Sequence, residues 1–309
     1  MSGSAHGDLQ IGFMAGSGSR ASIEALEAEP IDSLWVGGHI ASRNPGPEAL
    51  SGLVRLAALT NRVRIGTSVL LLPLYPPAIV AKQVADADCM SGGRVTLGVG
   101  VGGEYPQEFR ACQVPVRERG ARTDEAIPLL RALWSGQEIS HSGRFYSMED
   151  VKLHPAPIQA GGPPIVVAGR KPAAMRRAAL LGNGWMPYLY SPRRYAESVK
   201  TITAIASEVG RELDGFEWFA FVFVNVNPDR QVARREAAGF LGGNYHQEFD
   251  AMLDSVAAVG TPSEVADRLG AFVEAGVRHF VFTPATRSDP TPIRAFLLEE
   301  VLPQVRASR

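Results

Sequence analysis

The chain alternates short apolar runs with segments of helical spacing, and this alternation restricts its fold more than any other feature. Eight of the apolar runs have the length and the β-branched content of buried strands. They cover residues 9–15, 33–37, 63–72, 95–100, 164–169, 184–188, 217–225 and 279–284. Strands that alternate with helices form a parallel sheet, and eight repeats favour a closed barrel. The sequence therefore predicts an α/β fold, a (β/α)8 TIM barrel with insertions.

The alternative is an open, doubly wound sheet, which normally carries a phosphate-binding loop after its first strand. Residues 12–20, GFMAGSGSR, are rich in glycine and serine at that position. A lone glycine cluster is weak support for such a loop. The barrel therefore remains the favoured fold.

The expected helices have clear start and stop signals. Pro76 and Pro77 open a helix that Gly92 ends, and Pro172 opens another. Residues 261–276 begin with a threonine cap and end with glycine.

Two long connections interrupt the regular alternation. Residues 136–163 contain several glycines and prolines and are expected to form an insertion with a small hairpin, outside the barrel. Residues 228–260 have helical character and are expected to fold over the barrel mouth. No linker composition divides the chain, so residues 1–309 are expected to form a single domain.

Composition excludes several classes of partner. The net charge is −1, which gives no reason to expect nucleic acid or a membrane surface. The apolar stretch at 69–81 contains Pro73, Pro76 and Pro77 and is too short to span a bilayer. The N-terminal residues lack a basic segment followed by an apolar one, so no signal peptide is expected. The chain has two cysteines in no metal-like or redox-like spacing, which favours a reducing, cytoplasmic location.

The active site of such a barrel lies at the carboxyl ends of its strands, so the residues there are the candidate site residues. His39 follows the second strand and is a candidate acid or base, because imidazole titrates near neutrality. Glu104 follows the fourth strand and is a weaker candidate. After the fifth strand, Arg170 and Lys171 stand at a helix start, where backbone N–H groups favour an anion such as phosphate. The third strand carries Thr67 and Ser68, two hydroxyls inside an apolar run.

Other chemistries have little support. The six histidines are scattered and no HExxH spacing occurs, so no metal is expected. No GxSxG elbow for nucleophilic hydrolysis is present. Few titratable groups beside a predicted anion site indicate a bound cofactor that supplies the reactivity.

Five segments closely resemble the bacterial luciferase-like oxidoreductases: residues 32–40, 64–103, 117–136, 163–185 and 259–282. The resemblance extends in order over nearly the whole chain. It implies a (β/α)8 barrel with an insertion, a homodimer, and FMN or the deazaflavin coenzyme F420 as cofactor. The segment GTSVLLLPLYPP and the compact length of the chain favour the deazaflavin branch of this family. In that branch a hydride is transferred to or from a small organic substrate.

The resemblance also implies roles for individual residues. A non-proline cis peptide at Ser68–Val69 would form a bulge that supports one face of the cofactor ring. Val101 and Gly102 would contact the cofactor, and His39 would handle a proton beside the ring, with Glu104 near a second carboxylate position. The phosphate-bearing chain would be held by the turn after the fifth strand, namely by Ala168, Gly169, Arg170, Lys171 and Ala173.

Two alternatives remain open. One is an FMN-dependent luciferase-like monooxygenase, in which reduced flavin activates oxygen. The other is a non-catalytic flavin-binding protein. Two departures from the resemblance stand out, because Gly38 occupies a position where relatives carry aspartate and Asn183 replaces the aspartate of a GDGW motif.

Overall fold

A computed structural model describes residues 9–16, 18–41, 46–245 and 247–307. Its main sheet is parallel and is built around eight barrel positions, the third of which is split into two pieces. The order around the barrel is β1, β2, β3, β5, β8, β9, β10, β12, and β12 pairs back onto β1. The strands are β1 (Gln10–Met14), β2 (Ser33–Val36), β3 (Arg64–Thr67), β4 (Leu70–Leu71), β5 (Val95–Gly100), β8 (Ile165–Ala168), β9 (Gly184–Met186), β10 (Glu217–Val226) and β12 (His279–Pro284).

The predicted barrel is confirmed, and all eight predicted strands are present. Residues 95–100 and 279–284 form strands with the predicted bounds. The third predicted strand, 63–72, is interrupted instead of continuous, because β3 ends at Thr67 and β4 resumes at Leu70. β5 pairs with both pieces, so one wall of the barrel contains a break at residues 68 and 69.

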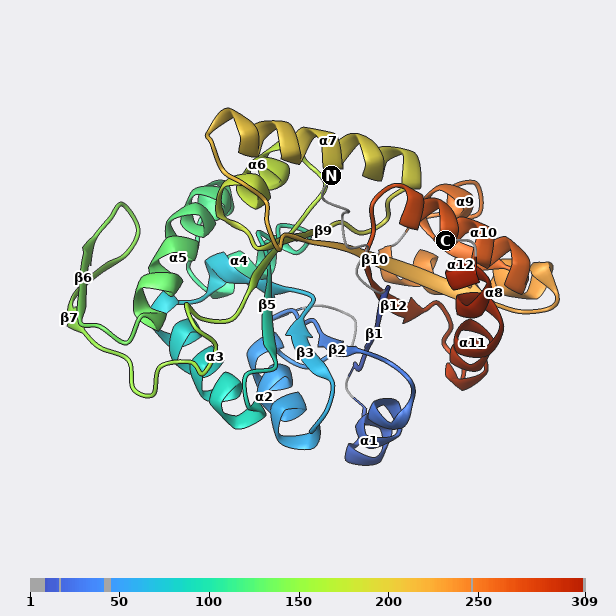
Figure 1. Ribbon diagram of the computed structural model, residues 1–309, viewed down its shortest axis with the longest axis horizontal. Coiled ribbons are helices and arrows are strands. Elements are labelled where there is room, and N and C mark those ends of the chain that lie inside the picture. Colours follow the sequence, from blue (N-terminus) through green and yellow to red (C-terminus); the bar gives the residue numbers. More distant parts are fainter. Residues whose placement is uncertain (1–8, 17, 42–45, 246, 308–309) are drawn as a thin grey trace, which may run out of the picture.

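Helices surround the barrel, as Figure 1 shows. Those between successive strands are α1 (Arg20–Ala28), α2 (Ala49–Leu59), α3 (Pro77–Ser91), α4 (Pro106–Ala111), α5 (Arg119–Trp134), α6 (Pro172–Leu181), α7 (Pro192–Glu208), α8 (Arg230–Tyr245), α9 (Leu253–Val256) and α10 (Pro262–Glu274). The chain ends with α11 (Thr291–Phe296), the π-helical turn η3 (Leu297–Val301) and α12 (Leu302–Ala307). Two short 3₁₀ turns, η1 (Leu72–Leu74) and η2 (Val116–Glu118), lie before α3 and α5.

The helix boundaries follow the predicted signals. α3 begins at Pro77 and ends at Gly92, which is left-handed at φ 70° and therefore suits glycine. α10 has a reciprocal capping box, since the backbone N–H of Glu264 donates to the Thr261 hydroxyl and the Glu264 carboxylate accepts from Thr261.

The barrel interior is packed around one tryptophan. Trp35 is fully buried and shares an apolar cluster with Val166, Met186, Phe219 and Val281. A Cβ on Gly66 would lie 2.4 Å from the Trp35 ring, so only glycine leaves room for the indole. The tryptophan therefore fills the barrel core beneath Met14, Val69 and Phe221, which pack against its cluster.

A polar network lies at the amino end of the barrel, below Trp35. The Ser33 hydroxyl is 2.6 Å from Nε2 of His279 and accepts from Nε1 of Trp35 at 2.8 Å. Arg64 forms a bidentate ion pair with Glu217, and the His279 ring stacks on Phe219. Burial, reinforced by the Arg64 charge, holds the pKa of His279 well below its ordinary value.

The 136–163 connection contains an antiparallel hairpin, β6 (Ile139–Ser142) and β7 (Ser147–Val151), which projects from one end of the molecule in Figure 1. It forms a sheet separate from the barrel, as the glycine and proline content predicted. The Glu125 carboxylate holds the hairpin against α5 by accepting hydrogen bonds from the backbone N–H groups of Phe145 and Tyr146.

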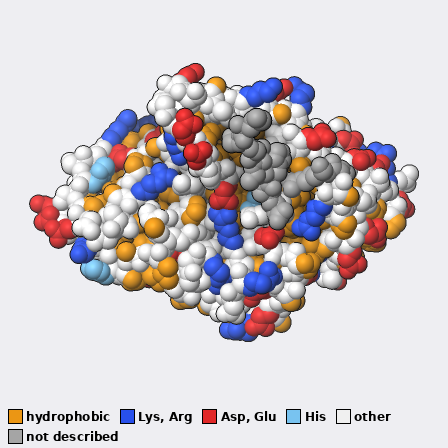
Figure 2. Space-filling view, in the orientation of Figure 1, with side chains coloured by type: hydrophobic (Ala, Val, Ile, Leu, Met, Phe, Trp, Pro, Cys, Tyr) orange, Lys and Arg blue, Asp and Glu red, His pale blue; other side chains and the backbone are white. Residues whose placement is uncertain are grey.

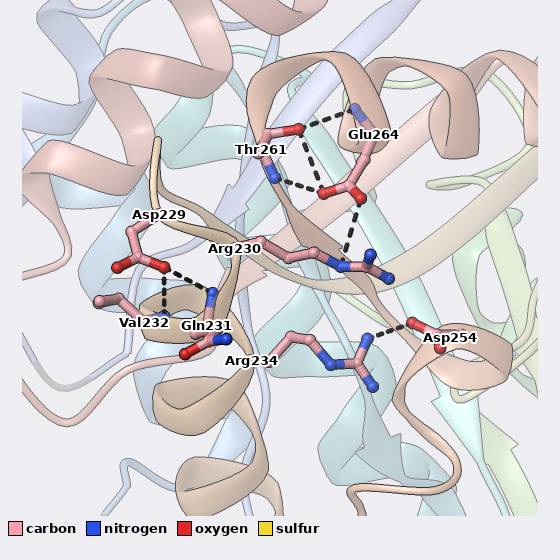
Figure 3. Close-up of polar contacts among 8 residues, drawn as sticks. All are labelled: Asp229, Arg230, Gln231, Val232, Arg234, Asp254, Thr261 and Glu264. Atoms are coloured by element: carbon pink, nitrogen blue, oxygen red, sulfur yellow. Dashed lines mark hydrogen bonds and ion pairs between the residues drawn. The ribbon is translucent and has the colours of Figure 1, made fainter.

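The 228–260 connection contains α8, α9 and the short strand β11 (Ala258–Gly260), which extends the sheet beside β10. An ion pair between Arg234 and Asp254 at 2.5 Å joins two parts of this connection, and one between Arg230 and Glu264 at 3.3 Å links it to α10 (Figure 3). The apolar face of α8 packs through Leu241 over the end of β10.

In the described part of the chain, none of the helices is both long and apolar enough to cross a bilayer. On the face shown in Figure 2, basic and acidic side chains are interspersed and do not gather into a patch of one sign.

Candidate functional site

A cavity of about 850 Å³ opens at the carboxyl ends of the barrel strands. Ten of the eleven predicted site residues line it, and Ala173, in the first turn of α6, does not. The cavity therefore gathers segments that lie far apart in the sequence. Its lining residues are Met14, Gly37–Ala41, Gly46, Ser68, Val69, Leu71, Gly100–Gly102, Glu104, Arg119, Ala168–Lys171, Met186, Tyr188, Phe221 and Tyr245.

The break in the third strand forms one wall of this cavity. The Ser68–Val69 peptide is cis, as the resemblance implied. Space around it is made by glycines, since a Cβ on Gly37 would lie 2.4 Å from the Ser68 carbonyl oxygen. The paired hydroxyls have separate roles, because Thr67 donates to the Gly98 carbonyl at 2.7 Å whereas Ser68 points to Met186.

His39 is held by a buried carboxylate. Its Nδ1 lies 2.8 Å from Oε1 of Glu108, a residue of α4 that is 1% exposed. The other carboxylate oxygen of Glu108 accepts from the backbone N–H of Ile40 at 2.6 Å, which fixes the carboxylate as an acceptor. Nδ1 therefore carries the donated hydrogen, and Nε2 is left as the ring nitrogen available to the cavity. The ring also packs edge-on against Tyr105.

Glu104 has a different partner. Its Oε1 accepts from the Tyr188 hydroxyl at 2.7 Å, and the Arg170 guanidinium lies 4.6 Å over the Tyr188 ring. Burial, reinforced by the Glu104 carboxylate, raises the pKa of Tyr188 to about 12, so this hydroxyl remains a donor near neutral pH. Glu104 thus contacts the cavity without contacting His39.

Three cationic side chains line the same side of the cavity: Arg119, Arg170 and Lys171. Arg119 approaches the loop after β5, where a Cβ on Gly103 would lie 3.1 Å from its Nε. That Nε is buried and has no hydrogen-bond partner. Because a buried guanidinium donor is normally paired, Arg119 is suited to receive an anion at this loop. Gly102 and Gly103 both have positive φ, which lets the backbone approach a ligand closely.

Several residues of this site were not identified from the sequence, namely Glu108, Tyr188 and Arg119 and the apolar or aromatic Met14, Phe221 and Tyr245. Glu108 stands four residues beyond Glu104 on the same loop and helix, so spacing alone could not distinguish the two carboxylates. Tyr188 ends the predicted strand 184–188, and neither it nor Arg119 carries a local signal of function. Within the described residues, no cluster of three or more histidine, cysteine or acidic side chains could hold a metal ion.

The sequence of the chain is similar to those of known proteins. Residues 16–279 match the family model described as luciferase-like monooxygenase. An F420-dependent glucose-6-phosphate dehydrogenase of Beutenbergia cavernae is 30% identical over 332 aligned residues, covering 97% of this chain and 98% of that protein.

Two solved structures show the same fold. An F420-dependent secondary alcohol dehydrogenase in complex with an F420–acetone adduct has a TM-score of 0.81 at 22% identity, over 97% of this chain and 100% of that one. A monooxygenase from Streptomyces bottropensis has a TM-score of 0.82 at 22% identity, over 96% and 99% of the two chains.

Proposed function

The chain belongs to the luciferase-like monooxygenase family, and we propose that it is a coenzyme F420-dependent oxidoreductase that transfers a hydride to or from a small organic substrate. The glucose-6-phosphate dehydrogenase relative, which spans nearly the whole chain, supports this cofactor. The observation that carries the proposal is the pair of His39 with the buried Glu108, which presents one imidazole nitrogen to a cavity whose opposite side is cationic.

The residues of the cavity fit such a cofactor. Ser68 and Val69 offer a backbone surface for a flat ring, and Gly100 leaves space beside Val69, where a Cβ would lie 2.7 Å from Val69 Cγ2. Arg119, with its unpaired buried Nε, and the Arg170–Lys171 turn would hold the phosphate-bearing chain. Val101, Gly102, Ala168 and Gly169 would contact the cofactor through backbone, and Ala173 would act only by supporting the turn.

When bound, coenzyme F420 accepts or donates a hydride. The protein handles the proton that accompanies this transfer. Nε2 of His39 accepts the proton from a substrate hydroxyl, or returns it to a carbonyl oxygen, while Glu108 holds the ring in one tautomer and orientation. The carboxylate also stabilises the imidazolium once the proton is taken up. Glu104 keeps the Tyr188 hydroxyl fixed at the cavity wall.

Direct titration tests the proposal. Coenzyme F420 and, separately, FMN are added to the purified chain while the cofactor's fluorescence is followed. Saturable binding of coenzyme F420, tighter than that of FMN, is the expected result. A chain that binds neither cofactor would contradict the proposal.

The second candidate is an FMN-dependent monooxygenase, favoured by the monooxygenase that shares the fold. Tight binding of FMN, with oxygen consumption in the presence of reduced FMN and an aldehyde or alkane, would establish it. A non-catalytic flavin-binding protein has no need of the Glu108–His39 pair, and cofactor binding without turnover would support that function.

We also propose that the chain forms a homodimer and is located in the cytoplasm. Sedimentation tests the oligomeric state, and cell fractionation tests the location.

A further inference from the structure

The wall of the cavity is divided by charge around the barrel. Every cation among its described lining residues follows β5 or β8. The neighbouring arc of β10, β12, β1 and β2 carries His39 as its one titratable group other than tyrosine, again among the residues that the structure describes. The cofactor side and the remaining side of the cavity therefore have different chemistries.

The second arc is apolar and aromatic where it meets the cavity. Met14 of β1 and Phe221 of β10 belong to the barrel cluster that also includes Val69. Tyr245, at the end of α8, lies 6.2 Å from the Phe223 ring and 5.7 Å from the Phe249 ring, centroid to centroid. Burial raises the pKa of Tyr245 well above its ordinary value, so its hydroxyl stays neutral, and the described lining residues of this arc include neither a lysine, an arginine nor a carboxylate.

A charged group placed against Met14 and Phe221 would lose its hydration, and no lining residue of this arc that the structure describes offers it an ion-pair partner other than His39, so its burial is costly. A neutral oxygen next to Nε2 of His39 would instead be hydrogen-bonded, with its carbon body against Met14, Phe221 and Tyr245. Those two conditions restrict the class of substrate.

We infer that the substrate of this site is a neutral ketone or secondary alcohol with an apolar body, and that phosphorylated sugars bind poorly beside His39. The inference rests on the proposed function, because it reserves Arg119, Arg170 and Lys171 for the cofactor. In the oxidising direction the carbinol C–H bond would break with its hydride taken by the bound coenzyme F420, and Nε2 of His39 would take the hydroxyl proton as the C–O bond becomes C=O. Reduction of the ketone reverses both transfers.

Calorimetry on the chain without added cofactor gives a readout independent of turnover. The probes are cyclohexanone and glucose 6-phosphate, and the variants are Phe221→Lys, the matched control Phe221→Leu, and the triple variant Arg119→Ala, Arg170→Ala, Lys171→Ala. Cyclohexanone should bind the Phe221→Lys variant about tenfold more weakly and the Phe221→Leu variant within about threefold of the original chain. Any glucose 6-phosphate binding should disappear in the triple variant, which lacks every cation of the described cavity lining.

Two results would overturn the inference. One is glucose 6-phosphate binding that survives the triple variant, since it would require a phosphate site away from the cationic side. The other is cyclohexanone binding that is indifferent to a lysine at position 221.

With coenzyme F420 bound, cyclohexanol should be oxidised with a kcat/KM at least about 100-fold above that for glucose 6-phosphate. The opposite order would also refute the substrate class. Failure of coenzyme F420 to bind would contradict the proposed function alone, because the calorimetric comparison decides the substrate class without the cofactor.

Discussion

Glu108 and His39 are 69 residues apart in the chain, yet Oε1 of the carboxylate lies 2.8 Å from Nδ1 of the imidazole. The carboxylate is almost completely buried and does not line the cavity, but it holds His39 and the backbone N–H of Ile40, which do. Its role is therefore to position His39.

Replacing Glu108 with glutamine should lower kcat about 100-fold, because an amide can donate to Nδ1 and stabilise the wrong tautomer. The Kd for the cofactor should stay within about threefold, since Glu108 does not line the cavity. The shape of the pH profile of kcat/KM should change, which simple structural damage would not cause. Glu24→Gln, at an exposed ion pair, is the control.

Replacing His39 with alanine should lower kcat by about 10²–10⁴-fold, the range for loss of a general acid or base. Cofactor affinity should change far less, because the ring is held on the protein side by Glu108 and Tyr105. Steady-state kinetics and cofactor titration measure the two effects. Equal losses in both would assign His39 to binding.

Removing both Arg170 and Lys171 should weaken cofactor binding by about 1–3 kcal/mol, the scale of charge-assisted hydrogen bonds. The dependence of Kd on salt should also decrease, because fewer charges contribute. The exposed Arg193→Ala substitution should change neither quantity. An unchanged salt dependence in the double variant would place the anion elsewhere.

Stability should fall as the pH drops below about 6.5, because His279 is buried as a neutral ring. Its pKa in the folded chain lies below that in the unfolded chain, so the unfolded chain binds more protons in this window. Stability therefore rises with pH, by at most about 1.4 kcal/mol per pH unit for one proton. Urea unfolding at several pH values should show a smaller slope for His279→Gln than for the original chain. Identical slopes would mean that His279 is not the group responsible.

Gly66→Ala should destabilise the fold by about 1–3 kcal/mol, because the added methyl would overlap the buried Trp35 ring. Gly270→Ala is the matched control, since a Cβ there meets open space on α10. It should raise stability by up to about 1 kcal/mol through helix propensity. Urea unfolding compares the two, and equal effects would exclude steric conflict as the cause.

The fold could be predicted because the alternation of apolar runs and capped helices is a local property of the sequence. Pro77 and Gly92 bound α3, and Thr261 opens α10, by hydrogen bonds and dihedral preferences that act within a few residues. The break in the third strand was suggested by resemblance to the family, because the apolar run 63–72 continues through it.

The cavity was predicted in outline because strand ends converge in a parallel barrel. Which carboxylate meets His39 depends instead on how the loop after β5 turns into α4, and that path places Glu108 inward and leaves Glu104 to Tyr188. Arg119 lies at the start of α5, and in the sequence this position is far from the end of any strand. Such pairings are set by tertiary packing, which local patterns do not contain.

The charge division of the cavity follows the order of the chain. The cationic side and the cis peptide come from residues 64–188, whereas the apolar side comes from residues 14–41 and 221–245. The two functions proposed for the wall are thus encoded in separate stretches of the sequence. Exchange of the terminal stretches between related barrels could alter what is bound beside His39 and leave the central stretch unchanged.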